Sequence, residues 1–169
     1  MRENKNRLVT AWITLLVLLG CSQTIYSADY LDNISEEYLR SVFTFGSADK
    51  LKYSECKKKS YPTCTYVWGT KSDKDAIRIK HGQPPGGNQL MVIYAQAGAR
   101  KDFQRVTATY SDAVTVKGIG EEAVWSAKRR QLSLITDKNL VVHVNIREKG
   151  KNSTKEKSIA VAQHVLEKL

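Results

Sequence analysis

Two runs of basic side chains are the residues of this 169-residue chain whose types and spacing most directly predict chemistry. Three adjacent ammonium groups beside Tyr61 attract an anionic surface, so we predict an anion-binding patch that the second run extends. The competing interpretation is that lysines at a strand edge discourage sheet-to-sheet aggregation. The six residues are Lys57, Lys58, Lys59, Lys128, Arg129 and Arg130.

Histidines, cysteines and acidic pairs are the other residues that commonly carry catalysis or bind metals. His143 has no partner at a useful spacing, so we expect an outward or partly covered strand residue rather than a ligand or base. Glu121 and Glu122 are adjacent, and on a strand they would point to opposite faces. Cys56 and Cys64 have no third or fourth ligand nearby, so no metal or other cofactor is predicted. No common catalytic motif occurs either, which favours a non-enzymatic domain.

The N-terminal segment has the pattern of an export signal. Residues 1–7 contain three basic side chains and one acidic side chain, and residues 8–19 are uncharged. An apolar stretch of this length suits a signal peptide and is short for a bilayer span, which needs about 20 residues. The sequence Leu18-Leu19-Gly20-Cys21 resembles the lipobox of bacterial lipoproteins, in which the cysteine is acylated and becomes the first residue after cleavage.

This resemblance implies a signal peptide at residues 1–20, lipidation of Cys21 and a location in the bacterial cell envelope, facing the periplasm. Ser22 follows the cysteine where Asp would favour the inner membrane, so the outer membrane is favoured. Two alternatives stay open. One is an ordinary signal peptide cleaved near Ala28, which would leave Tyr26 where a small residue is expected; the other is an uncleaved helical anchor.

A disulfide follows from the same resemblance. If Cys21 is acylated, Cys56 and Cys64 are left as one pair, and the periplasm is oxidising, so we expect them to be joined. Closing so short a loop would stabilise the fold by roughly 2–3 kcal/mol in the chain-entropy model. The three lysines of the first basic run would then lie inside the closed loop.

The charge of the chain favours anionic partners. The net charge is +10, and residues 1–20 hold three basic residues and one acidic residue, so the rest of the chain carries +8. Such a surface suits anionic lipid, a polyanionic glycan or an acidic envelope protein. Nucleic acid is not expected, because an exported lipoprotein rarely meets it. The plainer interpretation is that scattered lysines keep the domain soluble.

Hydrophobic periodicity predicts the elements of the first half of the chain. Beyond a polar tether at residues 21–28, apolar residues recur at steps of three and four over residues 30–43, which indicates a helix capped by Asn33 or Ser35. Alternating patterns at residues 64–68 and 77–80 predict two strands. The proline- and glycine-rich residues 82–88 predict a loop, either for recognition or as a simple hairpin connection.

The second half is predicted in the same way. Residues 90–95 are apolar on both faces, which is typical of a central strand. Residues 100–110 favour a second helix, and residues 131–135 and 140–146 favour a hairpin around a turn at residues 137–139. Residues 153–169 show the clearest helical pattern, with Ser153 and Glu156 as a capping box.

A second resemblance concerns residues 116–125, which read Val-x-Gly-Ile-Gly-Glu-x-Ala-x-Trp. They resemble a segment of small bacterial lipoproteins and secreted sensor-like domains of unknown function, in which a Cys-x-Tyr-x-Trp strand like residues 64–68 also recurs. The resemblance covers roughly residues 60–169 and implies a curved antiparallel sheet packed by helices, with no activity attached. The two glycines by themselves predict a sharp turn before the next strand.

We therefore expect one α+β domain at residues 29–169, an antiparallel sheet packed by two or three helices, after the lipoprotein signal peptide. Its predicted role is a membrane-anchored, non-catalytic envelope lipoprotein that binds or helps assemble a partner. One alternative is a small-ligand sensor, which predicts an apolar cavity between sheet and helices. The other is an envelope enzyme, which predicts a deep pocket lined by His143 or acidic side chains.

Overall fold

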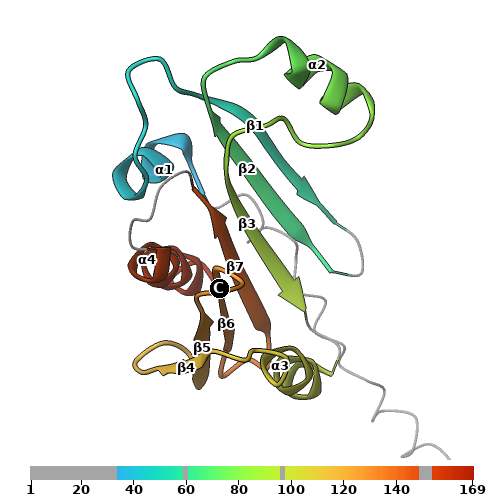
Figure 1. Cartoon of the computed structure of the whole chain (residues 1–169). Coiled ribbons are helices and arrows are strands. Elements are labelled where there is room, and N and C mark those ends of the chain that lie inside the picture. The colour runs from blue at the N-terminus through green and yellow to red at the C-terminus, as the bar shows by residue number, and fades with distance from the viewer. Residues whose placement is uncertain (1–33, 59–60, 96–97, 149–153) are drawn as a thin grey trace, which may run out of the picture.

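The computed structural model describes residues 34–58, 61–95, 98–148 and 154–169. They form a seven-stranded antiparallel sheet with the order β1-β2-β3-β7-β6-β5-β4 (Figure 1). The strands are β1 (Lys50–Lys57), β2 (Thr63–Gly69), β3 (Asn88–Ala95), β4 (Ala113–Val116), β5 (Glu122–Ser126), β6 (Gln131–Ile135) and β7 (Val141–Arg147). The helices in these residues are α1 (Glu36–Val42), α2 (Asp73–Lys80), α3 (Ala99–Thr107) and α4 (Thr154–Leu166). The predicted α+β class is confirmed.

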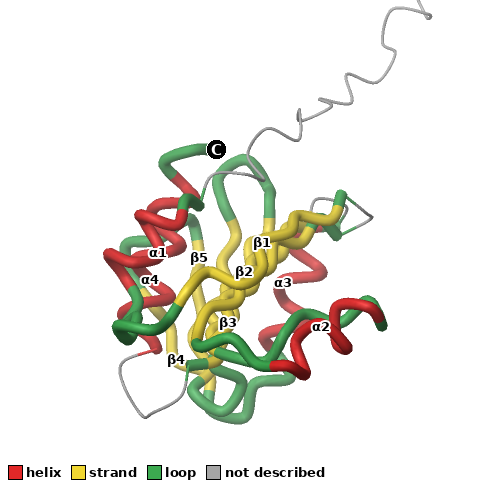
Figure 2. Tube along the Cα trace, turned by 90° about the horizontal axis from the view of Figure 1, so that it is seen from above, coloured by secondary structure: helices red, strands yellow, loops and turns green. Residues whose placement is uncertain are grey.

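The helices lie on both sides of the sheet. Seen from above, α1 and α4 lie on one side, and α2 and α3 lie on the other (Figure 2). The larger core is on the side of α1 and α4, where alternate strand residues point inward. Trp68, Leu90 and Leu132 are fully buried there, and Leu39 of α1 and Val161 of α4 pack into the same cluster.

A smaller core lies beneath α3. Phe103 of α3 packs with Ile135 of β6 and Val141 of β7. These two strands are therefore covered on both faces: β6 is buried except for Gln131, which is partly exposed, and β7 is buried except for Arg147. By contrast, no residue of β1 is buried. The sheet thus has a thickly covered half, which contains β6 and β7, and a thinly covered half, which ends at the edge strand β1.

The sequence predicts three of the four helices, with bounds that differ at their ends. Ser35 is the N-cap of α1, because its Oγ accepts a hydrogen bond of 3.1 Å from the backbone N–H of Tyr38. The rival cap Asn33 lies outside the described residues, as does the start of the helix predicted from residue 30. The last helix begins at Thr154, and its predicted cap Ser153 also lies outside the described residues.

The predicted strand at residues 77–80 is wrong, because these residues belong to α2. Ser72 and Asp75 form a capping box: the Ser72 Oγ accepts from the Lys74 N–H at 3.4 Å, and the Asp75 carboxylate accepts from the Ser72 N–H at 2.9 Å. The alternation of Ile77 and Ile79 carries no strand signal, since these side chains are 60% and 48% exposed and face no core.

The glycine turn and the following hairpin are confirmed. Gly120 has a φ of +58°, and a Cβ there would lie 2.5 Å from the carbonyl oxygen of Ile135, so a larger residue would force the chain to shift. β5 begins two residues later, and β6 and β7 pair as neighbours in the predicted hairpin. The residues predicted for a central strand form β3, which lies between β2 and β7.

Candidate functional site

A polar cleft lies where α2 and the proline- and glycine-rich loop meet the ends of β1 and β2. Its volume is about 440 Å³, which is within the range of small-ligand pockets. The loop joins α2 to β3, so it is not the hairpin connection that was one of its two predicted roles. The charged residues that line the cleft are Asp49, Lys52, Lys74, Asp75 and Arg78.

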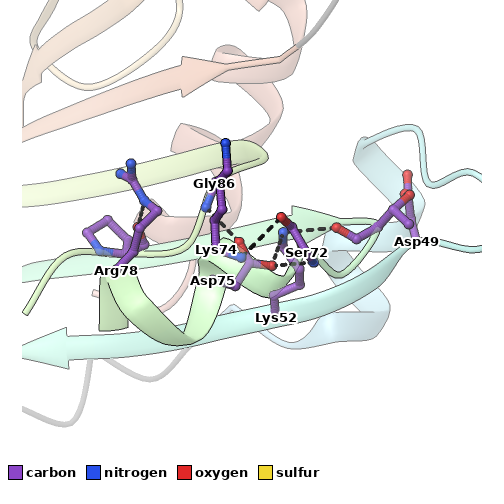
Figure 3. Close-up of polar contacts among 9 residues, drawn as sticks. Asp49, Lys52, Ser72, Lys74, Asp75, Arg78 and Gly86 are labelled. Carbon is purple, nitrogen blue, oxygen red and sulfur yellow. Dashed lines mark hydrogen bonds and ion pairs between the residues drawn. The ribbon is translucent and has the colours of Figure 1, made fainter. Parts of the chain in front are cut away.

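An ion pair between Lys52 and Asp75 forms the base of the cleft (Figure 3). The Lys52 Nζ lies 2.8 Å from Asp75 Oδ2 and donates a second hydrogen bond of 3.0 Å to the carbonyl of Thr70. The two side chains are only 5% and 14% exposed. Lys52 lies where the pairing of β1 with β2 shifts, and such a bulge re-aims a side chain. The pair ties β1 to α2.

The loop is fastened to α2 by two hydrogen bonds. The backbone N–H of Gly86 donates to Asp75 Oδ1 at 3.1 Å, and the Arg78 Nε donates to the carbonyl of Pro84 at 2.8 Å (Figure 3). Gly87 has a φ of +149°, and a Cβ there would lie 2.5 Å from the carbonyl oxygen of Trp68. Only glycine allows the loop to approach β2 this closely. The wall of the cleft is therefore held in place by the fold.

The carboxylates of the cleft are already bonded within the protein. Asp75 accepts hydrogen bonds from Lys52, Ser72 and Gly86, and the hydrogen bond from Lys52 is the main reason why its pKa lies below the usual value. Asp49 accepts from the backbone N–H of Gly46 at 2.8 Å and from the Thr70 hydroxyl at 3.2 Å. The charge of Asp75 is compensated by Lys52, whereas Asp49 is hydrogen-bonded to uncharged donors and keeps its negative charge.

Two cations of the cleft keep unused donors. Lys74 and Arg78 are exposed and lie one turn apart on α2, which places them on the same side of the helix. Figure 3 shows both side chains extending away from the Lys52–Asp75 pair. Among the described residues, neither the Lys74 ammonium nor the terminal nitrogens of Arg78 make a hydrogen bond or ion pair. The cleft therefore presents two free positive groups.

The two predicted basic runs do not come together. Lys57 ends β1 and Lys58 follows it, both exposed, whereas Lys59 lies outside the described residues. Residues 128–130 form the turn between β5 and β6. Because β6 is four strands from β1 in the sheet, the strands that carry the two runs are separated by about 19 Å of strand spacing along the sheet. The second run does not extend the first, and anion binding by either run stays a prediction.

The turn at residues 128–130 makes several contacts within the fold. The Lys128 Nζ donates to the Ser111 hydroxyl at 3.0 Å, and the Arg129 guanidinium lies 5.3 Å from the centroid of the Tyr110 ring. Arg130 has a positive φ of 51° and donates to a backbone carbonyl at 3.4 Å. These contacts give the run a structural role that the sequence alone does not reveal.

The predicted disulfide between Cys56 and Cys64 is confirmed. The two cysteines lie directly opposite each other in the β1–β2 pair, with their Cα atoms 4.0 Å apart. The bond therefore joins the edge strand to its neighbour, in the same pair of strands that Lys52 and Asp75 fasten to α2.

His143 is buried more deeply than predicted. It is 7% exposed beneath α3, and its Nδ1 lies 2.8 Å from the Ser133 Oγ on the neighbouring strand. The Tyr110 hydroxyl lies 2.7 Å from the same oxygen, and Gln131 donates to both hydroxyls. Burial lowers the pKa of His143 to about 4, against a smaller opposing effect of Asp102. Ser133 has no exposed surface, so its hydroxyl does not face solvent.

The prediction that Glu121 and Glu122 point apart is wrong. Glu121 precedes β5 and belongs to the glycine turn, so the alternation of a strand does not apply to it. Both carboxylates reach Arg100 of α3: Glu121 forms an ion pair with it, and Glu122 Oε2 lies 3.7 Å from its Nη1. The exposed cluster fastens the turn to α3.

The described residues contain neither a metal-binding cluster nor a membrane-spanning helix. No group of three or more His, Cys, Asp or Glu side chains there is arranged to hold a metal ion. Within residues 34–58, 61–95, 98–148 and 154–169, no helix has both the length and the apolar character needed to cross a membrane.

The sequence patterns do not single out Lys52, Lys74, Asp75 or Arg78. The usable signal was the serine at position 72 followed three residues later by an acidic residue, which marks a helix start. That signal would have placed Lys74 and Arg78 on one helix face. The pairing of Lys52 with Asp75 depends on a bulge in β1, which no local sequence pattern predicts.

We compared the chain with models of known protein families, with characterised proteins and with solved structures, and none of them matches it.

Proposed function

We propose that this chain is a lipid-anchored, non-catalytic domain of the bacterial cell envelope that binds an anionic partner. Its N-terminal charge pattern, the uncharged residues 8–19 and the lipobox-like sequence ending at Cys21 support export and lipidation. The disulfide between Cys56 and Cys64 fits an oxidising compartment.

The observation that carries the binding role is the charge arrangement of the α2 cleft. Its two carboxylates are bonded to protein donors, while the Lys74 ammonium and the Arg78 guanidinium keep donors free. With Lys52, Lys74 and Arg78 against Asp49 and Asp75, the lining of the cleft has a net positive charge, which attracts an anion. The excess of +8 in residues 21–169 acts in the same direction at longer range.

The anchor would keep this cleft near a bilayer. Thirteen residues lead from Cys21 to Ile34, the first described residue, and even a fully extended chain of that length spans at most about 45 Å. Partners in the membrane or close to it would therefore be met at high local concentration. Anionic lipid, an acidic glycan and an acidic envelope protein all remain compatible with this setting.

The experiment is purification of the native protein from bacterial membranes, with Cys21→Ser as the untethered control. We expect the chain with its original Cys21 in the membrane fraction together with a partner, and the Cys21→Ser chain in the soluble fraction. Equal membrane association of both chains would contradict the anchor. Turnover of an envelope substrate without any bound partner would contradict the non-catalytic role.

A further inference from the structure

We infer that the α2 cleft is a binding site for a single phosphate group, held between Lys74 and Arg78. The inference deepens the proposed function, on which it rests for the presence of an anionic partner, by naming the chemical group that the partner presents. It depends on the fixed orientation of the Arg78 guanidinium, on the placement of Lys74 beside it and on the number of hydrogen-bond donors in the cleft.

The first step is the orientation of Arg78. Its Nε donates to the carbonyl of Pro84 at 2.8 Å, which fixes the guanidinium plane against the loop (Figure 3). The two terminal nitrogens of the guanidinium then remain available at the cleft. A guanidinium held in this way loses little side-chain entropy when it binds an oxyanion through two parallel hydrogen bonds.

The second step is the pairing of Arg78 with Lys74. Like charges one turn apart on a helix repel each other, so the pair destabilises α2 slightly while the cleft is empty. An anion placed between the two groups removes that repulsion. Asp75, which lies between them in the sequence, does not serve this purpose, because it accepts from Lys52, Ser72 and Gly86 instead.

The third step is the choice of anion. A carboxylate has two oxygens and one charge, and Arg78 alone would satisfy it. A phosphate carries more charge and has three terminal oxygens, which match two cations together with a hydroxyl donor. Ser72 lines the same cleft, and its hydroxyl, which accepts from the Lys74 N–H, keeps its own proton to donate, whereas the Thr70 hydroxyl donates to Asp49. The donor set therefore fits a phosphate better than a carboxylate.

The phosphate could belong to a phospholipid headgroup or to a soluble phosphate ester, and both would present the same group to the cleft. A headgroup is within reach of an anchored domain, and a soluble ester would diffuse to it. The experiment below separates the two sources.

The test is calorimetric titration of the full chain, purified in a non-ionic detergent, with inorganic phosphate and separately with acetate. The variant is Lys74→Gln with Arg78→Gln. Its matched control is Lys71→Gln with Lys80→Gln, which removes the same charge from the same region at exposed residues that do not line the cleft. We expect the cleft variant to bind phosphate about tenfold more weakly or worse, and the control to stay within about twofold of the original chain.

Three results would overturn the inference: no phosphate binding by the original chain, equal weakening in both variants, or acetate binding as tight as that of phosphate. Circular dichroism of each variant checks that α2 and the sheet remain folded. If the cleft variant unfolds, Arg78→Lys replaces it, because lysine keeps the charge and loses the two-pronged geometry. Weakened phosphate binding by that variant would support the site, and unchanged binding would contradict it.

The source of the phosphate is tested with the Cys21→Ser chain and vesicles of phosphatidylglycerol or of phosphatidylcholine. Binding to phosphatidylglycerol that is lost in the cleft variant assigns the site to a headgroup. Phosphate binding without vesicle binding assigns it to a soluble ester. Either result supports the phosphate site, and both are independent of whether Cys21 anchors the protein, so the two proposals can fail separately.

Discussion

The two halves of the sheet are stabilised by different means. β6 and β7 lie between α3 and α4 and are buried along almost their whole length, so side-chain packing holds them. β1 has no buried residue, and it is held by a disulfide to β2 and by the Lys52–Asp75 ion pair to α2. The half with fewer packed residues carries the cleft.

The difference shows how an exposed region can keep a fixed shape. A cleft that must stay open to solvent cannot be filled with apolar side chains, so covalent and ionic links take over the role of packing. The thickly covered half can then provide most of the folding free energy. The following predictions test this division, beginning with the largest expected effect.

Truncation of a buried side chain in the thickly covered half should lower the free energy of unfolding by the largest amount. Leu132 is fully buried in the main core, and we expect Leu132→Ala to lower the free energy of unfolding by about 3–4 kcal/mol, through lost transfer energy and the cavity left behind. Ile93 lies on the partly open face of β3, and Ile93→Ala should cost only about 1 kcal/mol. Urea denaturation measures both. Equal losses would remove the distinction between the halves.

Acid should destabilise the same half through His143. Its pKa is about 4 in the folded chain, where burial disfavours the charged form, and 6.5 in the unfolded chain. Between pH 6.5 and pH 4 the unfolded state binds more protons, so stability falls as the pH falls, by roughly 3 kcal/mol in total. Denaturation midpoints measured across this range should show the loss.

The control for this prediction is His143→Gln, which keeps a polar group beside Ser133 and removes the titration. Its stability should change less between pH 7 and pH 4 than that of the original chain. An identical pH dependence in the two chains would mean that His143 is not the group responsible.

Loss of the disulfide should have a smaller effect, strongest in the thinly covered half. Replacing both Cys56 and Cys64 with Ala opens a loop of nine residues and should cost about 2.5 kcal/mol in the chain-entropy model. Hydrogen exchange should quicken more in β1 and β2 than in β6 and β7, because local opening at the sheet edge adds to the global loss. A reductant should lower the melting temperature of the original chain and leave the variant unaffected; a uniform rise in exchange would contradict the division.

Breaking the ion pair should have the smallest effect of this series. Lys52→Met removes the cation and leaves the Asp75 carboxylate with its two backbone hydrogen bonds, so we expect a loss of stability smaller than that for the disulfide. The matched change Lys50→Met lies on the same strand at an exposed position and should be nearly neutral. Equal effects would show that the pair does not hold the cleft together.

The sequence predicts the thickly covered half better than the thinly covered one. The alternation over residues 140–146 and the helical stripe of residues 153–169 reflect real buried faces, and both became β7 and α4. The strand predicted at residues 77–80 was wrong because Ile77 and Ile79 are exposed, so their alternation does not reflect a buried face. Periodicity works where one face is buried and fails where neither is.

Contacts between side chains were harder to predict than elements. The pairing of Ser133 with His143 depends on the register of β6 against β7, and the shared contact of Glu121 and Glu122 with Arg100 depends on where a turn ends. The disulfide was predictable because only two cysteines remained as partners once Cys21 was assigned to the lipid. Long-range polar contacts have no local signature of this kind.

Membrane attachment through Cys21 is the claim on which the proposed setting of the cleft depends. The most direct test is mass spectrometry of the N-terminal peptide of the protein recovered from bacterial membranes. The account predicts a chain that begins at residue 21 with a diacylglyceryl group on the cysteine sulfur. A product that retains Met1, or one that carries an unmodified Cys21, would contradict it.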